Sequence, residues 1–231
     1  MDLLQNFLYN FDLYGLLFLV VRVAAVVLCI MVHELCHGVA ARLLGDPTAT
    51  RAGRLSLNPL RHIDPVGFLM MLVTHVGWAK PVPVNIRYFK NPKRDMALTA
   101  LAGPASNFLL AAAALGIGSV LMRFGSQWSG PVWFAIILFL CYIAVLSVGL
   151  GLFNLIPIPP LDGSRLLFSM LPDRLYLQFM RWERYLMLVV IALACFGFFA
   201  GPLNVCMGWV LEKLCAVTRF PFAYLSYYFG F

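Results

Sequence analysis

Long runs of apolar residues dominate the chain and predict membrane-spanning helices, which need about 20 apolar residues to cross a bilayer core. The runs that are long enough are residues 14–44, 96–122, 131–156 and 185–203. A fifth run, residues 205–217, is short and carries Glu212 and Lys213, so it either crosses obliquely or lies at the interface. We therefore expect an all-α polytopic membrane protein with about four to six membrane segments.

Residues 63–76 form a shorter apolar run that begins with Asp64, Pro65 and Gly67, and its length argues against a full crossing. Basic residues flank it on both sides: Arg42, Arg51, Arg54 and Arg61 before it, and Lys80, Arg87, Lys90, Lys93 and Arg94 after it. Because basic loops stay on the cytoplasmic side, both flanks are expected there. This predicts a re-entrant element between the first two long helices, or a short β-hairpin where residues 48–57 alternate weakly.

Composition agrees with the membrane class, since 62% of the residues are hydrophobic and only 12% are charged. The net charge of +7 comes mostly from residues beside the apolar runs, and no nucleic-acid motif is present. Nucleic acid is therefore not an expected partner, whereas the lipid bilayer is. We expect a single integral-membrane domain over residues 1–231, with a core at about 14–165 and carboxy-terminal helices with an aromatic tail at 185–231. No insertion is large enough for a further regulatory domain.

The candidate chemistry lies at the end of the first apolar run, where His33, Glu34 and His37 form the pattern His-Glu-x-x-His. On a helix the two histidines stand about 40° apart around the axis, so both imidazoles can reach one metal ion. In soluble zinc peptidases with this pattern the glutamate is the general base for water. Ionisable residues at membrane depth are costly and usually functional, which favours a zinc hydrolase over histidines satisfied in a packing face.

A hydrolytic zinc usually has three protein ligands, so one more is needed, and Asp64 and Asp162 are the acidic residues that remain suitable. Asp162 is favoured because Pro157, Pro159 and Pro160 break a helix at membrane depth just before it. Irregular backbone is tolerated there only inside protein or beside a wet cavity. The alternative is an aspartate that caps a helix at an Asp-Gly turn.

Membrane topology links this choice to the re-entrant element. If residues 63–76 do not cross, His33 and Asp162 meet on one side of the membrane. If residues 63–76 do cross, the bilayer thickness separates the two residues. The ligand hypothesis and the re-entrant interpretation therefore depend on each other.

Several other residues are weaker candidates for metal or substrate binding. Cys36 is about 60° from His33 around the helix, but a packed apolar cysteine is the commoner state. His62 and His75 have no partner at ligand spacing. The sequence GPASN, which ends at Asn107, predicts either a kink with small residues for close packing or an amide that Asn107 offers to a substrate backbone.

Three motifs, HELCHG, GPASN and NLIPIPPLDG, occur in this order on successive membrane segments, and together they resemble the site-2 protease family of intramembrane zinc metalloproteases. The resemblance covers about residues 26–165. The sequences LNPLRHIDPVG and GWAKPVPVN also look like the compact prokaryotic branch that lacks PDZ and CBS domains.

The resemblance implies that His33, His37 and Asp162 bind one zinc ion per chain, with Glu34 as the catalytic base. It also implies that Asn107 and Asn154 are site-lining amides that contact the substrate. The expected reaction is cleavage of a substrate's transmembrane segment near the cytoplasmic face of a prokaryotic cytoplasmic membrane. A strand edge near residues 51–57 is a candidate for capturing the extended substrate.

Two alternatives from other functional classes stay open at this point. A metal transporter would distribute its ligands through the bilayer and repeat its broken helices. A catalytically idle scaffold would bind helices in the same groove. Neither explains why Glu34 accompanies the ligand set.

Overall fold

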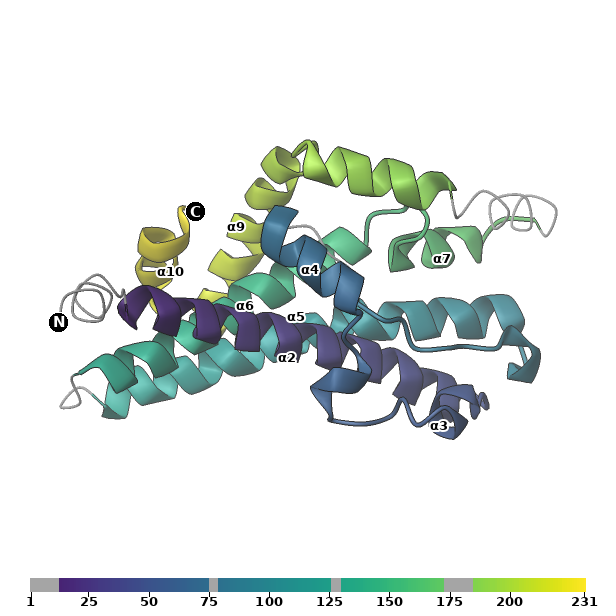
Figure 1. Ribbon diagram of the computed structural model, residues 1–231, viewed down its shortest axis with the longest axis horizontal. Helices are drawn as coiled ribbons and strands as arrows, with labels where there is room; N and C mark the ends of the chain where they lie inside the picture. Colours follow the sequence, from purple (N-terminus) through teal and green to yellow (C-terminus); the bar gives the residue numbers. More distant parts are fainter. Residues whose placement is uncertain (1–12, 75–78, 126–129, 173–184) are drawn as a thin grey trace, which may run out of the picture.

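The computed structural model describes residues 13–74, 79–125, 130–172 and 185–231, and this part of the chain is helical. Its three longest helices are α2 (Leu13–Leu43), α5 (Pro92–Phe124) and α6 (Pro131–Asn154). Each of them contacts the other two, and α5 runs antiparallel to α2 while α6 runs back along both (Figure 1). The all-α fold is thus confirmed, with a three-helix bundle at its centre.

Small residues let the three long helices approach one another. Ala25 of α2, Ala114 of α5 and Ile143 of α6 form one buried cluster with Cys29. Close packing of small side chains is the usual way to join helices in lipid, where apolar surface by itself gives no preference for protein neighbours. The hydroxyl of Ser147 adds a hydrogen bond to the Cys29 sulfur at 3.1 Å. The bundle therefore fixes α2 firmly against α6.

Proline marks where the long helices begin. Pro92 and Pro131 occupy the first turn of α5 and α6, where a backbone N–H has no partner within the helix. At the start of α5, Asp95 accepts a hydrogen bond from the Asn91 N–H at 3.0 Å. These signals explain why α5 begins slightly earlier than its apolar run.

Between α2 and α5 the chain forms short helices: α3 (Thr48–Arg51), η1 (Pro59–Arg61), α4 (Pro65–Thr74) and η2 (Ile86–Tyr88). Ile63 and Ala79 form an isolated antiparallel bridge, and the Lys80 N–H donates to the His62 carbonyl at 2.9 Å. The two ends of the segment therefore lie side by side. Because its two ends meet, the segment does not take the chain from one side of the membrane to the other. This agrees with the re-entrant interpretation.

The alternative β-hairpin over residues 48–57 is wrong, because residues 48–51 form α3 and the described residues after them form turns. Asp46 explains the helix, since its Oδ1 accepts the Thr48 N–H at 2.9 Å and so satisfies a donor of the first turn. Gly53 then adopts a φ of +63°, which breaks any strand alternation. The strand edge expected near residues 51–57 is likewise not formed.

The carboxy-terminal apolar runs divide at a different point from the one predicted. One helix spans Tyr185–Cys195 and the next, α9, spans Ala200–Thr218, with a bend of 79° between them. Gly197 has a φ of +72° in the break, and Pro202 falls in the first turn of α9, where it is tolerated. The expected uninterrupted helix over residues 185–203 is therefore wrong. After α9, the short helix α10 (Phe222–Phe229) packs against it.

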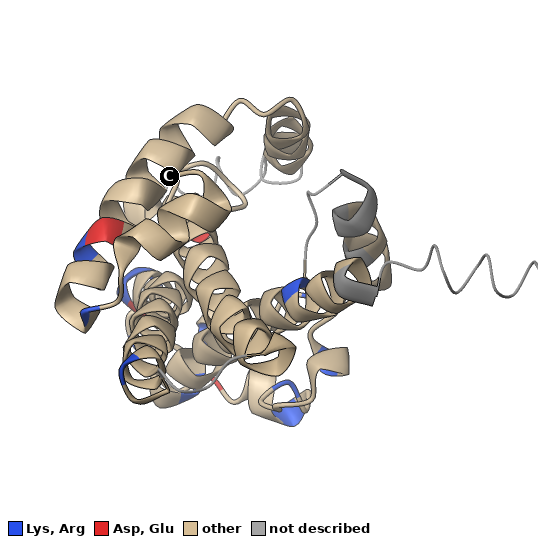
Figure 2. Ribbon diagram, turned by 90° about the vertical axis from the view of Figure 1, so that its left-hand side faces the viewer, with Lys and Arg blue, Asp and Glu red and all other residues tan. Residues whose placement is uncertain are grey.

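Within the described residues, three helices are long and apolar enough to cross a membrane: Gly15–Leu43, Pro92–Phe124 and Pro131–Asn154. The bent pair adds a fourth span if it is counted as one. Lysine, arginine, aspartate and glutamate occupy only a few positions on the ribbon (Figure 2). This distribution fits a protein whose helices face lipid along most of their length.

Candidate metal centre

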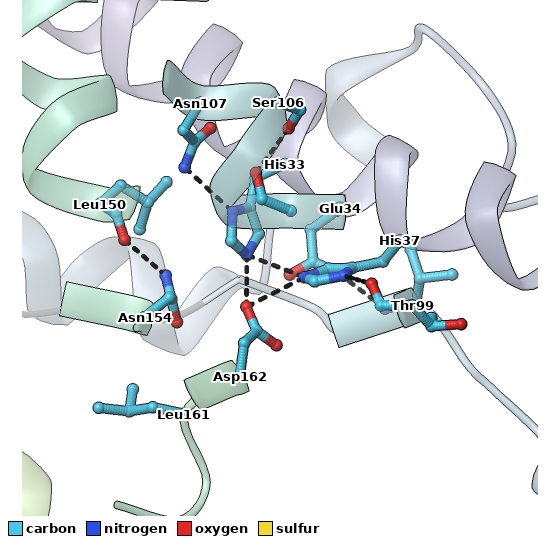
Figure 3. A network of polar contacts seen from close by, with 12 residues as sticks. His33, Glu34, His37, Thr99, Ser106, Asn107, Leu150, Asn154, Leu161 and Asp162 are labelled. Atoms are coloured by element: carbon cyan, nitrogen blue, oxygen red, sulfur yellow. Dashed lines mark hydrogen bonds and ion pairs between the residues drawn. The ribbon is translucent and has the colours of Figure 1, made fainter. Parts of the chain in front are cut away.

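His33, His37 and Asp162 converge at one point between α2 and α7 (Asp162–Phe168) (Figure 3). The Nε2 atoms of the two histidines are 3.0 Å apart, and the Oδ2 atom of Asp162 is 3.2 Å from each of them. Among the described residues, this is the one group of histidine, cysteine and acidic side chains arranged to hold a metal ion. The structure thus brings together the three residues that the sequence singled out as ligands.

Asp162 reaches the histidines because the chain turns back after α6. The helix ends at Asn154, and turns stabilised by hydrogen bonds follow, including one from the Leu161 N–H to the Ile158 carbonyl at 3.0 Å. Asp162 is the first residue of α7, and α7 packs against α5. The predicted break in the helix is therefore present. Its aspartate points at the histidines and makes no side-chain capping bond to its own helix.

Backbone and side-chain contacts orient both imidazoles. The Nδ1 atom of His37 lies 2.7 Å from the Thr99 carbonyl, which can only accept, so His37 donates from Nδ1. A neutral His37 then presents the lone pair of Nε2 to the site. His33 has its Nδ1 atom 3.0 Å from the side-chain nitrogen of Asn107. Contacts of this kind on the outer nitrogen fix the ring orientation of metal-binding histidines.

The donor set fits zinc. Zinc bonds of about 2.0–2.1 Å in a tetrahedron hold the ligand atoms roughly 3.3 Å apart, close to the separations of 3.0 and 3.2 Å found here. The Oδ2 atom of Asp162 is buried without a hydrogen-bond partner. A buried carboxylate oxygen that faces two imidazole nitrogens is satisfied by a cation placed between them.

Asp162 brings a carboxylate to the site, and His33 and His37 each bring one imidazole nitrogen. An aspartate carboxylate is normally ionised near neutral pH, and a neutral imidazole nitrogen has a lone pair for a metal ion. The site therefore offers one negative charge and two nitrogen donors, a combination typical of catalytic zinc.

Gly103 of α5 provides the space for the histidines. A Cβ atom at this position would lie 2.7 Å from Cε1 of His33 and still closer to Nε2 of His37. The GPASN sequence is thus explained by close packing: its glycine lets α5 press against the two rings. Its last residue, Asn107, is fully buried at His33.

Glu34 lies beside the three converging residues and is not one of them. Its Oε2 atom accepts a hydrogen bond from the Val82 N–H at 2.9 Å. The carboxylate is half-buried. A carboxylate that lies beside a cation site without being one of its donors is placed to accept a proton.

The remaining candidates lie elsewhere. Asp64 accepts from the Gly67 N–H at 2.8 Å at the start of α4, and the Nε2 atom of His62 is bonded to the Ser56 carbonyl at 2.8 Å. Asn154 is half-buried at the end of α6 and donates to the Leu150 carbonyl at 2.9 Å. Cys36 is half-buried outside the converging group, and His75 lies outside the described residues.

Sequence reasoning missed Thr99 and Val82, because both act through backbone atoms that carry no residue-type signal. Gly103 was noted only as a packing residue. Its helical position, four residues before Asn107 on the face that meets α2, was the available clue.

Comparison with known proteins agrees with this geometry. Residues 125–197 match peptidase family M50. Over 206 residues the chain is 34% identical to "Putative zinc metalloprotease YwhC" of Bacillus subtilis, covering 89% of this chain and 90% of that protein. The chain belongs to the site-2 protease family, M50. This site-2 protease is a zinc metalloprotease and an integral membrane protein.

Two further relatives carry the same description. Rip2 of Mycolicibacterium smegmatis is 30% identical over 155 residues, which cover 64% of this site-2 protease and 56% of Rip2. MJ0611 of Methanocaldococcus jannaschii is 30% identical over 164 residues, which cover 70% of this chain and 76% of MJ0611. No solved structure matches the chain at a significant level.

Proposed function

We propose that this protease cleaves transmembrane segments of membrane-protein substrates close to the cytoplasmic face, as in regulated intramembrane proteolysis. The observation that supports this most is the convergence of Asp162 with His33 and His37, which lie on a helix long enough to span a bilayer. A peptidase centre in this position meets substrates from within the membrane.

The depth of the centre follows from the position of His33 along α2. His33 is nine residues before Arg42 and twenty after Leu13, the first residue of α2, which correspond to about 14 Å and 30 Å along the helix axis. Arginine side chains near helix ends reach toward the membrane interfaces. The centre therefore lies in the half of the membrane nearer to Arg42, and the basic residues that follow α2 assign that side to the cytoplasm, in this proposal that of a prokaryotic cell.

In the proposed mechanism His33, His37 and Asp162 hold zinc. When bound, the metal supplies Lewis-acid polarisation of the scissile carbonyl and makes water acidic enough to react near neutral pH. Glu34 accepts the proton of the attacking water and passes it to the leaving amine. Thr99 keeps His37 in the tautomer that binds metal through Nε2, and Asn107 holds the ring of His33.

A helical peptide bond is a poor substrate, because its carbonyl is hydrogen bonded and side chains shield it. The substrate therefore has to unwind beside the centre. Asn154 ends α6 where the backbone becomes irregular, and its side-chain oxygen makes no hydrogen bond with the described residues. We assign Asn154 the contact with the unwound substrate backbone and Asn107 to the inner wall of the same site.

The rest of the chain completes one integral-membrane unit in this proposal. Residues from about 14 to 165 carry the catalytic centre, and residues 185–231 pack against it through α9. The partners are a transmembrane protein or peptide and the lipid bilayer.

The test uses purified protein in detergent and a synthetic transmembrane peptide. Glu34→Gln is expected to keep its zinc, because Glu34 is outside the donor set, and to lose hydrolysis by about 10²-fold or more, because the proton acceptor is gone. Zinc content and initial rate are measured on the same sample. Cleavage by Glu34→Gln at the parental rate would refute the general-base role, and loss of zinc from a folded variant would make Glu34 a ligand.

A further inference from the structure

The chain between α4 and η2 packs along α2 as an irregular segment at residues 79–85, here called the brace. Pro81 and Pro83 fix their own backbone φ and push the residues before them, Lys80 and Val82, into extended conformations. Exposure alternates along it, with Pro81 and Pro83 exposed and Val82 buried. The brace therefore presents Val82 to the protein interior.

Two buried charged residues hold the ends of the brace. The guanidinium of Arg54 donates to the carbonyls of Lys80 and Pro81, and Asp46 accepts the Asn85 N–H at 2.6 Å. Asp46 is fully buried and Arg54 is 8% exposed. Burying charges away from water is costly unless they are hydrogen bonded, and here the bonds go to the backbone of the brace. The position of this segment is thus strongly determined.

The centre of the brace touches the proposed catalytic base. The Val82 N–H donates to Oε2 of Glu34 at 2.9 Å. Proline has no N–H, so Val82 carries the one amide donor between Pro81 and Pro83. Oε1 of Glu34 receives no hydrogen bond from the described residues.

Gly38 of α2 leaves room for the side chains that pack beside Glu34. A Cβ atom at Gly38 would lie 3.2 Å from Cγ1 of Val82 and 2.5 Å from Cδ2 of Leu55. The glycine that follows the second histidine of the His-Glu-x-x-His pattern therefore accommodates Leu55 and the Val82 side chain of the brace. Val82 and Glu34 are 48 positions apart in the chain, so the contact depends on the whole connecting region.

We propose that Val82 is a positioning residue whose backbone amide fixes the Glu34 carboxylate through Oε2 and leaves Oε1 for the attacking water. A glutamate side chain has several rotatable bonds, and a base is effective only when it is held within hydrogen-bond reach of its proton. The brace supplies that hold through a backbone atom. This inference rests on the proposed role of Glu34.

Val82→Pro removes the donor and keeps an extended backbone. The variant is expected to lower kcat by about 10- to 100-fold, as misplacement of a catalytic group does, with KM and zinc content as in the parent. Val84→Pro is the matched control, because it makes the same change two residues away at an amide without a hydrogen bond to the described residues. Val82→Ala keeps the N–H and is expected to recover most of kcat.

A second pair of variants covers the case in which Val82→Pro does not fold. Arg54→Lys keeps the charge but cannot span the carbonyls that the guanidinium joins, so it loosens the brace. Its control is Arg51→Lys in α3, an exposed residue whose guanidinium contacts Tyr88. The hydrogen-exchange rate of the Val82 amide reports how tightly Glu34 is held. The rate is measured in a peptide that contains Val82, where Pro81 and Pro83 contribute no amide signal of their own.

The expected result is that Val82 exchange rises and kcat falls together in Arg54→Lys, with KM and zinc unchanged. Faster Val82 exchange with an unchanged kcat would overturn the inference, as would Val82→Pro with the parental kcat. The Glu34→Gln variant separates the two proposals. If it is inactive while Val82→Pro is fully active, only the role of Val82 fails, and if Glu34→Gln is active, the role of the base fails as well.

Discussion

At the scale of single residues, the centre depends on what surrounds the histidines as much as on the histidines themselves. His37 is bonded to a main-chain carbonyl of α5, and both rings lie against Gly103 in the same helix. A glycine in a long helix costs about 0.5–1 kcal/mol relative to alanine. That cost is tolerated at Gly103 because a side chain would occupy the space of the imidazoles.

Gly103→Ala is therefore expected to displace the rings of His33 and His37 and to weaken zinc binding by at least about 10-fold. Gly116→Ala is the control in the same helix, since a Cβ atom there meets nothing within 4 Å. It should keep zinc and gain a few tenths of a kcal/mol in helix stability. Zinc affinity from competition with a chelator and thermal unfolding distinguish the two variants. Equal zinc affinity in the two variants would contradict this prediction, because it would show that the imidazoles can shift away from a Cβ atom at position 103 without loss of zinc.

At the scale of elements, the decisive feature is the interruption between α6 and α7, which turns Asp162 toward α2. The prolines after Asn154 made the interruption predictable, because three of them in a short stretch cannot continue a helix. The bend between Cys195 and Ala200 was not predictable in the same way, since its residues are apolar and only Gly197 and Pro202 mark it. The brace also escaped prediction, because its contacts use carbonyls and amides that every residue has.

Asp162→Ala should lose most of its zinc, whereas Asp64→Ala should keep it. Asp162 faces both histidines at 3.2 Å, while Asp64 is bonded to the first turn of α4. The loss of that cap is expected to cost about 1 kcal/mol of stability. Zinc stoichiometry and thermal unfolding of the two proteins separate a ligand from a cap. The reverse pattern, with zinc retained in Asp162→Ala and lost in Asp64→Ala, would contradict the assignment.

At the scale of the whole molecule, the three-helix bundle holds the candidate metal centre among helices that are long enough to cross a membrane. The antiparallel order of α2, α5 and α6 follows from apolar length and from the short segment that returns at Ile63 and Ala79. These features were readable from hydrophobicity and flanking charge. The closeness of α5 to the histidines was not, because it depends on packing that a pattern of apolar residues does not specify.

Substrate peptides should be cleaved faster when they contain glycine, proline or asparagine near the scissile bond. Relative to alanine or leucine, glycine and proline lower the cost of leaving a helix by about 1 to 3 kcal/mol, and asparagine lowers it by less. A peptide series of constant length and hydrophobicity, assayed by initial rates in one detergent, measures the effect. Rates that stay flat across the series would mean that unwinding does not limit cleavage and that the protease cuts segments already extended.

The position of Asp162 also sets the order of events during biogenesis. His33 and His37 lie on the first long helix, and Asp162 follows His37 by 125 positions, after α5 and α6. A ribosome delivers the amino-terminal helix first, so a growing chain exposes two histidines long before the carboxylate is made. In the proposed zinc site, complete coordination closes one large loop and ties α2 to α7, so that metal binding is coupled to a late step of assembly. We therefore expect a chain released before Asp162 is made to have no peptidase activity inside the membrane.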